Sequence, residues 1–271
     1  MALYSHRFSA IRGGGLAQWV DGPWAAIYAC KILDVLARKK GEGMKQPTAI
    51  SVDALTVDFS GFRALDNLTL LAQYGEIHGV IGPNGAGKTT MMDVITGITQ
   101  PTSGKVLLDR EIDVLRMTLP ERARAGIGRK FQRPSVFEYL TVRENIALGV
   151  RLYPDSLIRE LAFGEVEEKS DRVESVLKTI SLDHLGEVMA GTLAHGQKQW
   201  LEIGMVLARD PKLLMLDEPV AGMSDAERDA TADLLERLRS PARCILLVEH
   251  DMQFVGRVSD QVSVLHEGRL L

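Results

Sequence analysis

The feature that most constrains the fold is a glycine-rich segment at residues 82–89, with the sequence GPNGAGKT. It fits the phosphate-binding pattern G-x-x-x-x-G-K-[ST], in which glycines let the backbone curl so that its N–H groups face phosphate oxygens. A short apolar strand is predicted before it, over 76–81. A helix is predicted after it, over 87–98, and its N-terminus adds partial positive charge. Because a simple glycine-rich turn does not need these flanking elements, the segment predicts a strand–loop–helix phosphate site.

The side chains of this segment have separate expected roles. Lys88 is expected to reach the β- and γ-phosphates of a nucleoside triphosphate, and the Thr89 hydroxyl is expected to hold Mg²⁺. The residues expected to bind the cofactor here are Gly82, Pro83, Asn84, Gly85, Ala86, Gly87, Lys88, Thr89 and Thr90.

A second motif, LLMLDEP at 213–219, places two adjacent carboxylates at the end of an apolar run. Asp217 ends the predicted strand, where a carboxylate can reach a Mg²⁺ opposite the phosphate loop. Glu218 points in another direction because neighbouring strand residues alternate, so it can act on a water molecule as a general base. Acidic pairs are usually solvated strand ends. The four apolar residues before this pair and the phosphate loop upstream reverse that expectation.

The wider pattern of strands alternating with helices predicts an α/β fold with a mainly parallel sheet. Strands are predicted over 50–59, 67–71, 76–81, 104–108, 213–216, 244–248 and 262–265, and helices over 87–98, 142–150, 166–180, 196–209 and 225–238. The helical middle indicates an inserted subdomain over about 134–209. The folded domain is expected to span 47–271.

Residues 1–46 differ from this domain and are treated as an N-terminal extension. Residues 13–15 form a Gly-Gly-Gly break, and residues 23–41 show helical spacing of apolar residues with a basic end. One interpretation is a docking or membrane-surface helix. The interpretation we favour is an appendage, or translated upstream sequence, with Met44 as the working start.

Composition excludes some classes of function. The net charge of −4 gives no global basic field, so composition does not indicate a nucleic-acid partner. No uncharged apolar run approaches the roughly 20 residues that span a bilayer. We therefore expect a soluble chain whose membrane partner, if it serves transport, is another protein. Cys244 lies in the apolar run CILLV and is expected to be a buried free thiol.

A third motif, LAHGQKQWLEIG at 193–204, lies between the phosphate loop and the acidic strand. This order of motifs resembles the ATP-binding subunits of ABC transporters, in which the phosphate loop is called Walker A. The resemblance covers about 50–271. It implies a P-loop (RecA-like) nucleotide-binding core with an antiparallel β-subdomain and an inserted α-helical subdomain. A P-loop kinase, the competing interpretation, would not need the Gly-Gln pair or the VEHD motif at 248–251.

The resemblance assigns roles to further residues. Gln132, in KFQRP, matches the Q-loop glutamine that touches Mg²⁺ and water, and His250 matches the switch histidine that contacts the γ-phosphate. Phe59 matches the aromatic residue that stacks on adenine. Phe62 competes with it, and an aromatic residue is often core instead.

The resemblance thus implies a complete site. Gly196 and Gln197 match the signature that binds the γ-phosphate of an ATP molecule held by another subunit. The expected catalytic residues are Glu218, His250 and Gln132, and the expected metal ligands are Thr89, Gln132 and Asp217.

The family pattern also implies partners. Two cassettes sandwich two ATP molecules, ATP binding closes them, and hydrolysis opens them. We expect a heterodimer with a second ATP-binding subunit, two transmembrane permease subunits and, indirectly, a solute-binding protein. The complex would place this chain peripherally on the cytoplasmic face of the inner membrane. The candidate contacts for the permease's coupling helix are Arg133, Pro134, Val136 and Phe137.

The transported solute is suggested only by resemblance. The segments HGQKQWLEIGM at 195–205 and EPVAGM at 218–223 look like the branched-chain amino acid and urea uptake branch, and the first looks most like the urea transporter's subunit. We therefore expect urea import, with branched-chain amino acids as the alternative. A soluble ABC ATPase of DNA repair or translation is a third possibility. Those ATPases typically have two cassettes or long coiled-coil insertions, which this chain lacks.

The chain departs from the family pattern at its signature. Position 194 is Ala where the family usually has a serine whose hydroxyl binds the γ-phosphate. A hydrogen bond to a charged group contributes roughly 1.5–3 kcal/mol, so its loss is expected to weaken one ATP site. Ser224 occupies the position of the family's D-loop aspartate. Relatives usually continue beyond the last strand with a helix. The end at Leu271 is therefore compatible either with truncation or with a naturally short C-terminus.

Overall fold

The computed structural model describes residues 47–130, 135–150 and 166–271, all within one unit that spans 43–271. The N-terminal extension and its expected helix lie outside the described residues, as do Gln132, Arg133 and Pro134. Within the described ranges, no helix is both long enough and apolar enough to cross a membrane.

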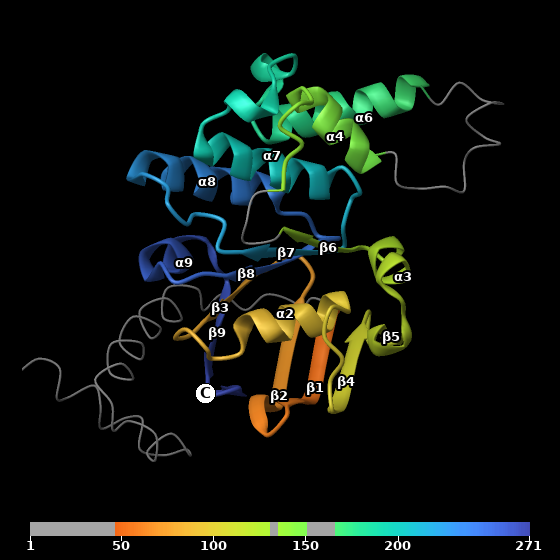
Figure 1. The fold of residues 1–271 in the computed structure, drawn as a ribbon, viewed down its shortest axis with the longest axis vertical. Helices are drawn as coiled ribbons and strands as arrows, with labels where there is room; N and C mark the ends of the chain where they lie inside the picture. The colour runs from red at the N-terminus through yellow and green to blue at the C-terminus, as the bar shows by residue number, and fades with distance from the viewer. Residues whose placement is uncertain (1–46, 131–134, 151–165) are drawn as a thin grey trace, which may run out of the picture. The chain divides into compact units, whose positions relative to one another are not determined.

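A mainly parallel six-stranded sheet forms the centre of this unit (Figure 1). Its strand order is β10-β9-β3-β8-β7-β6, and only β10 runs antiparallel to its neighbour. The strands are β3 (Ile77–Ile81), β6 (Ile127–Lys130), β7 (Leu213–Asp217), β8 (Cys244–Val248), β9 (Gln261–His266) and β10 (Arg269–Leu270). Strands β3, β7 and β8 are buried along their whole length, because helices or a second sheet cover both faces. The predicted α/β fold is confirmed.

A four-stranded antiparallel sheet of order β2-β1-β4-β5 packs with helix α2 (Lys88–Thr96) on one face of the central sheet. Its strands are β1 (Thr48–Phe59), β2 (Phe62–Gln73), β4 (Ser103–Leu108) and β5 (Ile112–Asp113). Leu213 and Met215 of β7 pack against the antiparallel sheet and α2, whereas Leu214 and Leu216 pack against the helices on the opposite face of the central sheet. This alternation with a period of two is what a strand imposes on its side chains.

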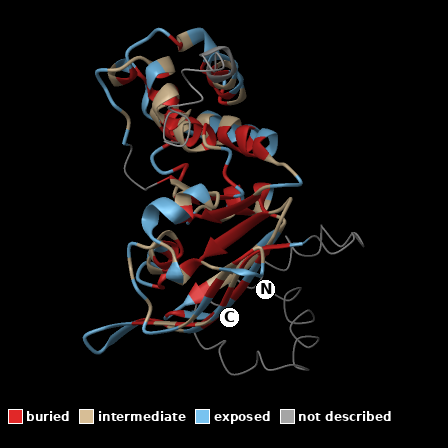
Figure 2. Ribbon diagram, turned by 90° about the vertical axis from the view of Figure 1, so that its right-hand side faces the viewer, coloured by how far each residue is buried: buried red, intermediate tan, exposed pale blue. Residues whose placement is uncertain are grey.

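Helices cover the other face of the central sheet, and Figure 2 shows its buried strands beside helices that are only partly buried. These helices are α4 (Val142–Val150), α6 (Val166–Thr179), α7 (His195–Leu207), α8 (Asp225–Leu238) and α9 (Met252–Val258). The remaining helical elements are α3 (Leu119–Arg124) and the 3₁₀ turns η3 (Val114–Arg116), η5 (Asp183–Leu185) and η6 (Ala190–Thr192).

A side-chain cap sets where α8 begins. The N–H and hydroxyl groups of Ser224 donate to Glu227 at 2.9 and 2.8 Å, which forms a capping box at the start of α8. Helix α7 has only half of such a box. The N–H of Ala194 donates to Gln197 Oε1 at 3.0 Å, but Ala194 has no side-chain oxygen with which to accept a bond in return.

The sequence prediction missed several short elements, namely β5, α3, β6, α9 and β10, and it began β2 at Asn67 instead of Phe62. Strand β6 was missed because Gly128, Arg129 and Lys130 leave only one apolar residue in it. The buried free thiol predicted at Cys244 is confirmed.

Candidate functional site

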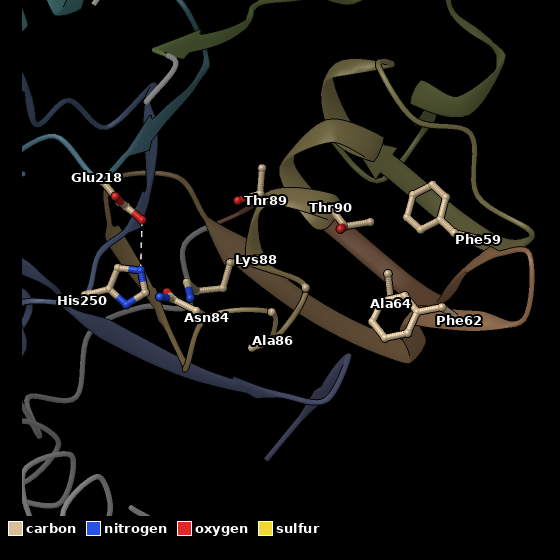
Figure 3. A pocket seen from close by; sticks show the side chains of 12 residues that line it. Phe59, Phe62, Ala64, Asn84, Ala86, Lys88, Thr89, Thr90, Glu218 and His250 are labelled. Atoms are coloured by element: carbon tan, nitrogen blue, oxygen red, sulfur yellow. Dashed lines mark hydrogen bonds and ion pairs between the residues drawn. The ribbon is translucent and has the colours of Figure 1, made fainter. Parts of the chain in front are cut away.

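A pocket of about 770 Å³ opens where β3, β7 and β8 end beside the start of α2 (Figure 3). Ligands of open α/β sheets bind outside the carboxyl ends of the strands, which is where this pocket lies. Its lining consists of Phe59, Phe62, Ala64, Asn84, Gly85, Ala86, Gly87, Lys88, Thr89, Thr90, Glu218 and His250. The structure therefore brings most of the sequence-predicted residues together from separate parts of the chain. Gly82, Pro83 and Asp217 are not among the lining residues.

The phosphate loop is packed tightly against the chain behind it. The N–H of Gly268 donates to Ala86 O at 3.0 Å. A Cβ added at Gly82 would lie 2.1 Å from the carbonyl oxygen of Leu265. Gly85 differs, because a Cβ there would have no neighbour within 4 Å, although its φ of +78° is left-handed. Glycine is thus needed at 82 for space and at 85 for backbone conformation.

Lys88 is held by its own loop. Its ammonium group donates to the carbonyl oxygens of Gly82 at 2.8 Å and Pro83 at 2.9 Å. Burial lowers the pKa of Lys88, and the nearby carboxylates of Glu218 and Asp217 oppose that effect. An ammonium group fixed in this way, beside loop N–H groups and a helix N-terminus, gives the pocket a positive centre suited to an anion.

Asp217 does not line the pocket and takes part in an ion-pair network with Arg129. Arg129 Nη2 lies 2.9 Å from Asp217 Oδ2, and Arg129 Nη1 lies 2.5 Å from Asp93 Oδ1 on α2. The side chains of Arg129 and Asp217 are each 4% exposed, so this pair is shielded from water. Arg129 thereby connects β6, β7 and α2. The sequence alone does not predict this pairing, because nothing local in IGRK indicates a partner 88 residues away.

Glu218 instead points into the pocket. Its φ of +47° is left-handed, which is uncommon outside glycine and turns its carboxylate away from the direction of Asp217. Its Oε1 lies 3.0 Å from His250 Nε2. Strained backbone of this kind persists only where the surroundings fix it, and here the N–H of Glu218 donates to Val248 O at 2.9 Å.

A buried carboxylate that sequence reasoning missed lies behind this pair. Glu249 accepts hydrogen bonds from the N–H groups of Val220 and His250, both at 2.9 Å. Burial raises the pKa of Glu249, while these backbone bonds lower it. Glu249 therefore joins the segments that follow β7 and β8.

Two phenyl rings lie at the other end of the pocket from Glu218 and His250 (Figure 3). Phe59 and Phe62 pair with each other across the β1–β2 turn, and they are 49% and 65% exposed. Neither ring is a core residue, so the structure leaves both available to a ligand.

The predicted signature residues lie elsewhere. Gly196 and Gln197 are in the first turn of α7 and do not line the pocket. A Cβ at Gly196 would lie 2.7 Å from Glu227 Oε1, so α7 begins in close contact with α8. Gln132 lies outside the described residues.

Comparison with known proteins identifies the family. The model of the ABC transporter family matches residues 65–221. The high-affinity branched-chain amino acid transport ATP-binding protein BraF of Pseudomonas aeruginosa is 35% identical over 226 residues, which cover 81% of this chain and 88% of BraF. The corresponding LivG of Escherichia coli K12 is 36% identical over 233 residues, covering 83% and 90%.

Solved structures agree with these sequence matches. The crystal structure of the ADP conformation of an ATP-binding cassette of an ABC transporter has a TM-score of 0.73 and 28% identity, covering 83% of this chain and 89% of that one. This chain therefore belongs to the ABC transporter family, as an ATP-binding subunit that hydrolyses ATP.

Proposed function

We propose that this ATPase is the motor of a membrane importer and that the pocket beside α2 is its ATP site. The observation that supports this most is the order of groups along the pocket in Figure 3. Phenyl rings lie at one end, Lys88 and Thr89 lie in the middle, and the Glu218–His250 pair lies at the other end. A nucleotide with its base on the rings would place its phosphates on the loop and its γ-phosphate beside Glu218.

Each group then has a task in hydrolysis. Lys88 turns from its own carbonyl partners to the β- and γ-phosphates. Glu218 accepts a proton from the attacking water, and a general base contributes roughly 10²–10⁴ in rate. His250 holds the carboxylate of Glu218 in place and contacts the γ-phosphate. The left-handed backbone of Glu218 directs its carboxylate into the pocket.

The residues beside the loop also fit Mg²⁺. This ion prefers oxygen ligands and is usually bound by one or two carboxylates together with substrate phosphates. Thr89 and Asp217 supply such oxygens. When bound, Mg²⁺ would neutralise charge on the β- and γ-phosphates. Gln132 stays a proposed third ligand.

The signature residues fit a contact with a partner cassette. Gly196 and Gln197 lie outside this chain's own pocket, as a role at another subunit's ATP would require. We propose a heterodimer with a second ATP-binding subunit, and purified complexes that hold only this cassette as a homodimer would contradict it.

A second pocket supports a docking site for the permease. It has a volume of about 430 Å³ and lies between the edge of the central sheet and the helices that cover it. Leu119 and Phe137 line it and are 56% and 54% exposed, so an apolar coupling segment would bury them. Val136 is partly buried against the core beneath, and Arg133 and Pro134 lie outside the described residues. Docking there would hold this chain peripherally on the cytoplasmic face of the membrane.

For the transported solute, the relatives support the branched-chain amino acid alternative better than urea, because BraF and LivG are transport proteins for branched-chain amino acids. We therefore propose branched-chain amino acid import. The test is uptake of labelled leucine and labelled urea by cells with and without this chain. Loss of leucine uptake alone supports the proposal, and loss of urea uptake alone contradicts it.

A further inference from the structure

The signature turn, defined here as residues 194–197, is hydrogen-bonded to the segment that follows Glu218. His195 Nε2 lies 3.1 Å from the carbonyl oxygen of Ala221. A carbonyl oxygen can only accept, so Nε2 must carry the proton in this hydrogen bond. His195 is exposed, and its ring is therefore not retained there by burial in a core.

The same segment leads directly back to Glu218. The N–H of Ala221 donates to the carbonyl oxygen of Glu218 at 3.3 Å. Two hydrogen bonds in series thus connect the ring of His195 with the backbone of Glu218. The φ of +47° at Glu218 determines where its carboxylate points. A shift of the backbone at Ala221 would therefore change the direction of this carboxylate.

A second contact keeps the two segments together. Glu227, in the first turn of α8, accepts hydrogen bonds from Ser224, and its Oε1 would lie 2.7 Å from a Cβ added at Gly196. The bonds from Ser224 are the main reason that the pKa of Glu227 is lowered. The start of α7 therefore contacts the chain after Glu218 at two points. His195 of α7 bonds to Ala221, and Glu227 of α8 packs against Gly196.

We propose that His195 is a positioning residue for ATP hydrolysis, which transmits engagement of the signature turn to Glu218. The proposal rests on the proposed function, in which the signature turn binds the γ-phosphate of ATP held by the partner cassette. Binding there moves the turn, the His195–Ala221 bond moves the segment after β7, and Glu218 takes its productive position on this chain's own ATP.

The test uses two substitutions in the purified, assembled transporter. His195→Phe keeps an aromatic ring but removes the N–H donor, and His195→Gln restores an N–H donor at similar reach. Phe is expected to lower kcat about tenfold, the size of one hydrogen bond, with the KM for ATP unchanged. Gln is expected to restore most of kcat. His184→Phe, at another exposed histidine in η5, is the matched control and should match wild type.

A binding measurement separates positioning from simple structural damage. In the Glu218→Gln background, which should bind ATP without hydrolysing it, His195→Phe is expected to leave the amount of ATP retained by the complex unchanged. Wild-type kcat in His195→Phe, or failure of Gln to rescue it, would overturn the proposal. A wild-type complex with no ATP hydrolysis above that of Lys88→Ala would instead overturn the proposed function on which it rests.

Discussion

His250 Nε2 lies 3.0 Å from Glu218 Oε1, so that the segments after two neighbouring strands meet at the mouth of the pocket. The two side chains are 39% and 21% exposed, which leaves the pair open to water. Glu249 joins the same two segments from behind through two backbone N–H groups. The pair is therefore accessible on the side of the pocket and held in place on the side of the core.

Glu218→Gln is expected to keep ATP binding and to lower hydrolysis by about 10²–10⁴, because the amide keeps the size of the side chain but cannot accept the proton from water. Phosphate release and nucleotide binding by the assembled complex measure the two effects. Glu267→Gln, in the exposed turn between β9 and β10, is the control and should behave as wild type. Near-normal turnover in Glu218→Gln would show that Glu218 is not the general base.

Arg129→Met is expected to lower the free energy of unfolding by about 3–5 kcal/mol, because Asp217 would stay buried without its cation and Asp93 would also lose its partner. Arg257→Met is the matched control. It removes an exposed arginine that pairs with Asp229 and Asp233, and is expected to cost at most about 1 kcal/mol. Urea denaturation of both variants measures the difference. Equal losses would show that the Arg129 network does not stabilise the fold.

The sequence predicted the phosphate loop and the acidic strand because both are local patterns with a fixed physical meaning. The loop needs its glycines and its lysine in order, and β7 needs an unbroken apolar run before Asp217. Both β3 and β7 were predicted for the same reason, since each is buried on two faces.

What sequence could not predict depends on contacts between distant residues. The charged strand β6 is stable at the sheet edge because Arg129 pairs with Asp93 and Asp217, and no local pattern reveals those partners. Glu249 resembles an ordinary solvated strand end until the fold buries it. The short helix α9 has too few residues to show a helical period. The hydrogen bond from His195 to Ala221 likewise exists only once α7 and the segment after β7 have packed together.

Gly82→Ala and Gly85→Ala are expected to differ although both lie in the phosphate loop. A Cβ at Gly82 would overlap the carbonyl oxygen of Leu265 at 2.1 Å, so the loop and β9 must separate. We expect a lower melting temperature and weak ATP binding. At Gly85 the space is open and the cost is only the left-handed φ, roughly 1 kcal/mol. Thermal unfolding with and without ATP tests this, and an equal loss of stability in both variants would contradict it.

Phe59→Ala is expected to raise the KM for ATP about two- to tenfold with little change in kcat, because an aromatic stacking contact contributes about 0.5–1.5 kcal/mol. Phe62→Ala is the comparison, since both rings line the same end of the pocket and are exposed. We expect the smaller effect there. A larger rise in KM for Phe62→Ala would assign the adenine contact to Phe62 instead. Because neither ring belongs to the core, the melting temperature should stay near that of wild type in both variants.

Ala194→Ser is expected to strengthen the signature turn in two ways. The hydroxyl would accept the N–H of Gln197 and complete the capping box that Gln197 half forms, which stabilises a helix by about 0.5–2 kcal/mol. It would also offer the partner's γ-phosphate a donor that alanine lacks, so ATP turnover of the assembled complex should stay the same or rise. Ala242→Ser, in an exposed turn, is the control for adding a hydroxyl. If Ala194→Ser clearly lowered turnover while unfolding stayed the same, alanine at this position would not be a weakened phosphate contact, and the turn would require a small apolar residue there.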